Sequence, residues 1–246
     1  MLRIMGTNSS WLLSVGVMLA AGLVRGFAGF GAAMIIMPGL SLIYRPVDAL
    51  AILTVIDIPA TLQLLPAAIR QARWRQVFLL ASGAAVSIPL GLWIMVSVDR
   101  EIMRRVIAVM VLLYVTVLAL GWRYRTTPGS PLILGVGAVS GFLGGSTGMG
   151  GPPVIVFLMS GSHQASAIRG SILAYFAVTT VIYLGLFGWQ YDVLTPQMWW
   201  HALVLTPVYV GATWLGSRLF RRASEHLYRW VTLVFLACLA FVVLLY

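Results

Sequence analysis

Long apolar stretches alternate with short polar ones along almost the whole chain. Each stretch is long enough to form a helix across the hydrocarbon core of a membrane, which needs about 20 residues. Eight such stretches can be counted, at residues 11–44, 47–69, 76–98, 102–122, 131–161, 166–188, 197–219 and 227–246. The polar residues between them leave room for short loops only. The pattern therefore predicts an all-α integral membrane protein that crosses the membrane several times.

The composition excludes a soluble protein of this size. Hydrophobic residues make up 61% of the 246 positions, and charged residues make up only 9%. A soluble domain carries about 25% charged residues, so this chain has too few to cover a surface that faces water. The mean hydropathy of +0.98 agrees with this conclusion. We therefore expect lipid to contact most of the outer surface.

The charge of the chain points to the membrane and not to nucleic acid. The formal net charge of +10 includes sixteen basic residues, all of them arginine. They lie mostly between the apolar stretches, where basic residues orient membrane segments and contact lipid phosphates. The single cysteine, Cys238, excludes a disulfide framework or a thiolate metal site within one chain. We expect no nucleic-acid partner, no metal and no cofactor.

One sequence unit is used twice. The motif Gly-Phe-Ala-Gly at 26–29 recurs as Gly-Phe-Leu-Gly at 141–144, 115 positions later, and Pro38 and Pro153 are related by the same offset. Such duplication is typical of transporters with internal repeats. The predicted parts of this single membrane domain are a first repeat at 1–122, a linker at 123–130 and a second repeat at 131–246.

The first apolar stretch of each half is too long for one crossing and too short for two. Residues 11–44 number 34, whereas one crossing needs about 20 residues and two need about 40. Glycines near the middle predict a broken or re-entrant pair, two short helices that meet at a glycine-rich tip inside the membrane. Each half would then cross three times, and the two repeats would be inverted. Four plain crossings per half, which would give parallel repeats, are the alternative; the arginine distribution favours inversion.

The two glycine tips are the predicted binding site for substrate. Glycine lets the backbone turn tightly and approach a ligand, and a helix that begins there offers free N–H groups and a positive dipole end to an anion. Close packing between helices is the other interpretation of glycine-rich membrane segments. The candidate substrate-binding residues at the tips are Gly29, Phe30, Gly31, Gly145, Ser146, Thr147, Gly148 and Gly150.

Three ionisable residues inside the apolar stretches are further candidates. Arg25 immediately precedes the first tip, Asp57 lies in the middle of the second stretch, and Arg169 lies near the start of the matching stretch in the other half. Ionisable residues are costly inside a membrane and therefore mark functional positions. We predict that Arg25 and Arg169 bind the anion, and that Asp57 couples transport to a proton or acts as a counter-ion. An Arg25 side chain that reaches the membrane interface, and a buried structural pair for Asp57, are the alternatives.

The second tip also fits the G-x-S-x-G pattern of a hydrolase nucleophile, with Ser146 as the serine. That motif requires a strand before it and a helix after it, and the apolar pattern provides no strand. An intramembrane serine hydrolase that pairs Ser146 with His163 or His201 is the alternative from a different functional class. We expect the chain not to be an enzyme.

At these tips the sequence resembles the TauE/SafE sulfite exporter family, also called the toluene-sulfonate uptake permeases. The matching segments are GFAGFG at 26–31, followed by Pro38, and GFLGGSTGMGGPP at 141–153. The number of spans and the duplicated plan are also similar, so the resemblance covers nearly the whole chain. It implies a carrier of sulfite, organosulfonates or other small anions in a bacterial inner membrane. It fixes neither the substrate nor the direction of transport.

The sequence as a whole predicts a secondary transporter. A sulfonate or related oxyanion, whose acceptor oxygens suit N–H groups and arginine, would bind between the two glycine tips while the halves rock in alternating access. The expected partners are the small anion, the lipid bilayer and, for coupling, a proton; a homodimer is left open. A carrier or channel for another small anion, such as a carboxylate, is the alternative within the same class.

Overall fold

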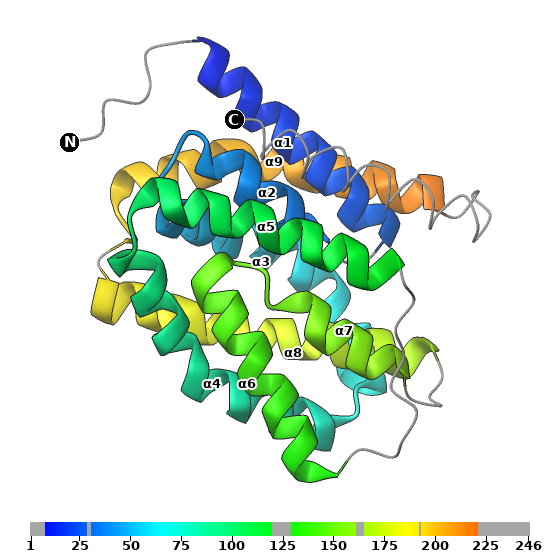
Figure 1. The fold of residues 1–246 in the computed structure, drawn as a ribbon. Coiled ribbons are helices and arrows are strands. Elements are labelled where there is room, and N and C mark those ends of the chain that lie inside the picture. The colour runs from blue at the N-terminus through cyan, green and yellow to red at the C-terminus, as the bar shows by residue number, and fades with distance from the viewer. Residues whose placement is uncertain (1–7, 29–30, 120–128, 161–164, 192, 221–246) are drawn as a thin grey trace. The chain divides into compact units, whose positions relative to one another are not determined.

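The computed structural model describes residues 8–28, 31–119, 129–160, 165–191 and 193–220. Helices account for nearly all of these residues and no strand occurs among them, which confirms the predicted all-α class (Figure 1). The elements are α1 (Asn8–Ala28), α2 (Ala32–Ser41), α3 (Pro46–Gln71), α4 (Trp74–Ser97), α5 (Arg100–Ala119), α6 (Ser130–Thr147), α7 (Gly151–Ser160), α8 (Ala165–Leu186), the π-helical η1 (Phe187–Tyr191) and α9 (Pro196–Phe220). The last predicted stretch, at 227–246, lies outside the described residues.

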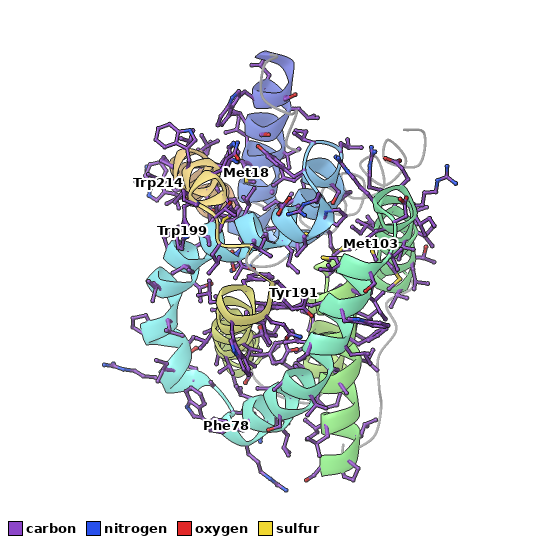
Figure 2. The ribbon with its side chains drawn as sticks, turned by 90° about the vertical axis from the view of Figure 1, so that its left-hand side faces the viewer. Met18, Phe78, Met103, Tyr191, Trp199 and Trp214 are labelled. Atoms are coloured by element: carbon purple, nitrogen blue, oxygen red, sulfur yellow. The ribbon has the colours of Figure 1, made fainter. Side chains whose placement is uncertain are left out.

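The outer faces of these helices suit lipid and not water. Three segments are long and apolar enough to cross a membrane, namely α4, α6 and Gly170–Tyr191. Large apolar side chains are exposed along several helices, with Val86 at 81% and Trp189 at 90%. Phe78 on α4 and Trp214 on α9 likewise lie on outer faces of their helices (Figure 2). Exposed apolar side chains in such number indicate contact with a membrane.

The chain divides into two compact units, and each takes helices from both predicted repeats. The first unit contains α1, α2, the part of α3 up to Ile56, α5 and α9. The second unit contains α3 from Asp57 onward, α4, α6, α7, α8 and η1. These units are defined by contacts in space, whereas the predicted repeats at 1–122 and 131–246 are defined by similarity of sequence. The repeat boundaries therefore stay a prediction.

In the first unit, α1 and α9 lie side by side and run in the same direction. The Trp11 ring contacts the His201 ring near the start of both helices, with centroids 5.7 Å apart. Further along both helices, Gly22 on α1 approaches the backbone of Tyr209, where an added Cβ would lie 2.6 Å from the carbonyl oxygen. Met18, on the same helix, is fully buried. α2 packs against both α1 and α5.

In the second unit, α4 and α6 form the most extensive helix pair. Three glycines of α6, spaced four residues apart, face α4: Gly137 approaches Leu80, Gly141 approaches Ala84 and Gly145 approaches Ile88. Because both sets of numbers rise together, the two helices are parallel. Small residues permit such close backbone approach, which is the usual basis of helix association in lipid. α8 packs against α4 and α7, and Tyr191 of η1 donates a hydrogen bond to the Pro89 carbonyl oxygen of α4 at 3.5 Å (Figure 2).

The helices of the two glycine-tipped pairs differ in length from the expectation. We expected two short helices in each pair, but α1 has 21 residues and α6 has 18. Only the second helix of each pair, α2 or α7, is short, with 10 residues. At a rise of 1.5 Å per residue, α1 is long enough for the hydrocarbon core and α2 is about half that length. In each pair, a helix of about full membrane length is therefore followed by a short helix that packs back against it.

Candidate functional site

The second hairpin reverses direction at Gly148. α6 ends there in a left-handed conformation, with φ +77°, and the Gly148 N–H donates to the Gly144 carbonyl oxygen at 2.8 Å. This is the usual glycine ending of a helix, since a Cβ disfavours positive φ. The preceding residues, Ser146 and Thr147, are both buried. Thr147 Oγ1 donates to the Leu143 carbonyl oxygen at 2.7 Å, so its hydroxyl proton is used within the helix.

A hydroxyl group holds the two arms of this hairpin together. Ser140 on α6 donates a hydrogen bond from Oγ to the carbonyl oxygen of Gly150, just before α7 begins. A Cβ on Gly150 would overlap the Ser140 carbonyl oxygen, so the two backbones are in contact. Ser140 Oγ also lies 2.7 Å from the hydroxyl oxygen of Tyr175 on α8. Ser140 and Tyr175 are 1% and 2% exposed, so this is a buried polar cluster in an apolar unit.

Sequence reasoning missed both Ser140 and Tyr175. A signal for Ser140 was available, because it is the polar residue immediately before the Gly-Phe-Leu-Gly motif. Tyr175 lies 35 positions away, and only the folded packing of α8 brings it to the hairpin. Tyr183, two helical turns beyond Tyr175, was missed for the same reason. Its hydroxyl oxygen packs on Gly144, where an added Cβ would lie 2.5 Å from it.

The start of α7 offers fewer backbone donors than expected. A helix N-terminus normally presents up to four free N–H groups, which together attract an anion. Pro152 and Pro153 occupy the first turn of α7 and carry no N–H. The donors left at this end are those of Gly150 and Gly151. An anion at this helix end would therefore depend on neighbouring side-chain hydroxyls for further hydrogen bonds.

Gly145 has a packing role that accounts for its missing side chain. It lies inside α6 and not at the break, and an added Cβ would be 2.5 Å from the Ile88 carbonyl oxygen of α4. The alternative interpretation of this glycine, close helix packing, is therefore what the structure supports at this position. A contact of Gly145 with substrate stays a prediction.

In the first hairpin, the described part of the connection between α1 and α2 is Gly31. This residue precedes α2 in a left-handed conformation, with φ +92°. An added Cβ on Gly39, near the end of α2, would lie 2.6 Å from a methyl group of Val17 on α1, so the two helices run antiparallel. The predicted residues Gly29 and Phe30 lie outside the described residues.

The ionisable candidates have different outcomes. Arg25 lies in the last turn of α1 and is 8% exposed. Its predicted role in anion binding, and the alternative of a side chain that reaches the interface, stay predictions. Asp57 is half-buried within α3 and accepts a hydrogen bond from Thr61 Oγ1 at 3.2 Å. Arg169 belongs to α8, but its side chain lies outside what the structure describes. The structure groups Ser146, Thr147, Gly148 and Gly150 at one hairpin and Arg25 with Gly31 at the other.

Neither a metal site nor a serine–histidine pair is found among the described residues. No group of three or more His, Cys, Asp or Glu side chains lies close enough there to hold a metal ion. No hydrogen bond within the described part of the chain joins Ser146 to a histidine; the ring of His201 instead contacts Trp11 and Tyr44. His163 lies outside the described residues.

Comparison with known families gives a match over nearly the whole chain. The model of the family described as "Sulfite exporter TauE/SafE" matches residues 14–243, which is nearly the whole chain. No curated protein and no solved structure matches the chain significantly.

Proposed function

Because this chain belongs to the TauE/SafE sulfite exporter family of membrane transporters, we propose that it carries a small sulfur-containing anion across a bacterial inner membrane. The substrate class is sulfite or an organosulfonate. The protein acts as a secondary transporter with alternating access, and both glycine-tipped hairpins contribute residues that bind the anion. It is not an enzyme.

The second hairpin is the observation that carries this proposal. It places three buried hydroxyl-bearing residues, Ser140, Ser146 and Thr147, beside a helix break in an otherwise apolar chain. Polar groups inside a membrane protein are costly and are retained where they serve a pathway or a ligand. Discontinuous helices near the middle of the membrane are also where many secondary transporters bind substrate. Arg25, buried at the first hairpin, supplies a positive charge for an anion.

The duplicated plan has support in the way the helices pair. If the repeats are 1–122 and 131–246, the first helix of each repeat lies beside the fourth helix of the other. α1 pairs with α9 in the first unit, and α6 pairs with α4 in the second. Both pairs are parallel and both are glycine-mediated. We propose that this matched pairing reflects an internal repeat; whether the repeats are inverted is a separate hypothesis.

The first experiment is ligand-induced thermal stabilisation of the purified protein against a panel of anions. The panel contains sulfite, sulfate, thiosulfate, taurine, sulfoacetate, an aromatic sulfonate and, as comparison, small carboxylates. A ligand that binds only the folded state raises its stability by mass action. We expect a shift with one sulfur anion, reduced in Arg169→Gln and retained in the matched control Arg105→Gln, whose side chain is exposed on α5.

Three results would change the proposal. No shift with any sulfur anion, together with a shift from a carboxylate, would replace the substrate class but keep an anion carrier. Substrate flux through reconstituted vesicles that rises without saturation would indicate a channel in place of a carrier. Cleavage of a substrate that is lost in Ser146→Ala would favour the hydrolase instead.

A further inference from the structure

Two tyrosines of α8 contact the second hairpin. Within the second unit, α7 packs against both α6 and α8 (Figure 1). Tyr175 reaches Ser140 on α6, and Tyr183 reaches Gly144 one turn further along the same helix. Two phenol hydroxyls from one helix therefore lie at successive turns of α6, immediately before its break at Gly148.

Counting protons fixes the direction of the hydrogen bonds. A serine hydroxyl has a single proton to donate, and a carbonyl oxygen such as that of Gly150 can accept hydrogen bonds but cannot donate them. Because Ser140 donates to Gly150, the proton shared with Tyr175 must come from the tyrosine. The order is Tyr175 to Ser140 to Gly150, and it ties α8, α6 and the start of α7 together. Removal of the Ser140 hydroxyl would leave the Gly150 carbonyl oxygen without this donor. Removal of the Tyr175 hydroxyl would leave the Ser140 side chain without the contact that orients it toward Gly150.

Tyr183 differs from Tyr175 in one respect. No hydrogen bond involving its hydroxyl is found among the residues that the structure describes, and its side chain is only half-buried. Its ring stacks on Phe187, with centroids 5.9 Å apart, so the ring position is fixed without the hydroxyl. The hydroxyl is held against Gly144, a position where any side chain would displace it. A fixed phenol donor without a protein acceptor is suited to an oxygen of a bound anion.

We propose that Tyr183 is a substrate-binding residue of the transporter, donating to an oxygen of the sulfur anion, and that Tyr175 and Ser140 are positioning residues that hold the hairpin in its binding shape. This inference rests on the proposed function. Pro152 and Pro153 leave few backbone donors at α7, so a neutral hydroxyl donor from α8 supplies hydrogen bonds that the helix end lacks. The neutral donors add directional contacts without a second buried charge.

The test compares Tyr183→Phe with Tyr191→Phe in the full-length protein. Both changes remove one hydroxyl in the same unit, but the Tyr191 hydroxyl already donates to a protein acceptor, the Pro89 carbonyl oxygen. The dissociation constants of sulfite, taurine and benzenesulfonate are measured by thermal stabilisation. Tyr183→Phe is expected to weaken binding of the recognised anion about 10-fold, as for loss of one hydrogen bond to a charged group, with ligand-free stability close to wild type. Tyr191→Phe should bind as wild type does.

The positioning role has its own readout. If Tyr175 acts through Ser140, the effects of Tyr175→Phe and Ser140→Ala on affinity will not add in the double variant. Additive effects would overturn that role. Unchanged affinity in Tyr183→Phe, while wild type binds, would overturn the assignment of Tyr183 and leave the proposed function standing. No binding of any of the three anions to wild type would overturn both.

Discussion

The two glycine hairpins share a plan but differ in the residue that precedes each motif. Arg25 stands before Gly-Phe-Ala-Gly in the first hairpin, and Ser140 occupies the position 115 residues later, before Gly-Phe-Leu-Gly. Both side chains are buried, at 8% and 1% exposed. A buried guanidinium brings a charge that requires compensation, whereas a buried hydroxyl brings a neutral donor. Under the proposed function, we predict a division of work in which the first hairpin supplies charge and the second supplies directional hydrogen bonds.

The hairpins also differ in where the break falls relative to the shared motif. α1 ends at Ala28, within the motif, and the equivalent residue is Leu143. α6 continues past Leu143 to Thr147, four residues further, which is about one helical turn. The second motif is therefore helical, and its glycines face α4 and Tyr183. Gly141 and Gly144 of the second motif thus serve helix packing.

The largest effect is expected where a glycine of the second hairpin packs against α4. Gly145→Ala would force a methyl group to within 2.5 Å of the Ile88 carbonyl oxygen, and neither backbone can yield easily. We expect a loss of about 3 kcal/mol in the free energy of unfolding, the upper range for overpacking. The measurement is denaturation of the purified protein in detergent.

Gly135→Ala is the matched control for that prediction. Gly135 lies on the same helix with nothing within 4 Å of an added Cβ. Alanine favours a helix over glycine by about 1 kcal/mol, so this variant should be as stable as wild type or slightly more. Equal unfolding of the two variants would show that α4 and α6 are not packed in this way.

The next prediction compares how much each hairpin contributes to anion affinity, through a charged side chain in the first and a neutral one in the second. Arg25→Gln should weaken binding of the recognised anion by about 2 kcal/mol, or roughly 30-fold, because it removes a charged donor. Ser140→Ala should weaken it by about 1 kcal/mol, or roughly 5-fold, because it removes the neutral hydrogen bond to Gly150 that holds the hairpin in its binding shape. Titration of both variants by thermal stabilisation gives the ratio. Arg25→Lys, which keeps the charge but not the planar geometry, should recover part of the loss. Equal losses in the two hairpins would contradict the division of work.

The sequence predicted the architecture better than the site. Apolar length and low charge were enough for the helices, because lipid selects helices and little else. The predicted glycine tips include Gly31 and Gly148, which adopt positive φ in the structure. The sequence could not show that the second break is displaced, because Gly141, Gly144 and Gly145 look alike whether they turn the chain or pack against α4. Tyr175 and Tyr183 could not be found either, since their role depends on tertiary contacts between distant helices.

A smaller effect is expected at the two left-handed glycines. Gly31 directly precedes α2 and Gly148 directly follows α6, and each adopts positive φ, so each should resist alanine to a similar degree. A left-handed conformation costs a residue with a Cβ about 1–2 kcal/mol. Asparagine tolerates this conformation better, so Gly31→Asn and Gly148→Asn should unfold at higher denaturant than the alanine variants. A penalty at only one of the two positions would mean that the hairpins do not share a strained turn.

The smallest effect on affinity is expected from Asp57, which belongs to neither hairpin. It accepts a hydrogen bond from Thr61 within α3, and asparagine offers the same acceptor with no ionisable proton. Asp57→Asn should therefore change the dissociation constant of the anion by less than about 2-fold, within the small effects of substitutions that keep a contact.

If Asp57 couples transport to protons, the variant should lose the dependence of transport rate on pH in reconstituted vesicles. Asp99→Asn is the control, because Asp99 caps the start of α5 through the Glu101 N–H at 2.8 Å and asparagine caps equally well. A pH dependence that survives in Asp57→Asn would remove the coupling role and leave Asp57 outside the proposed transport site.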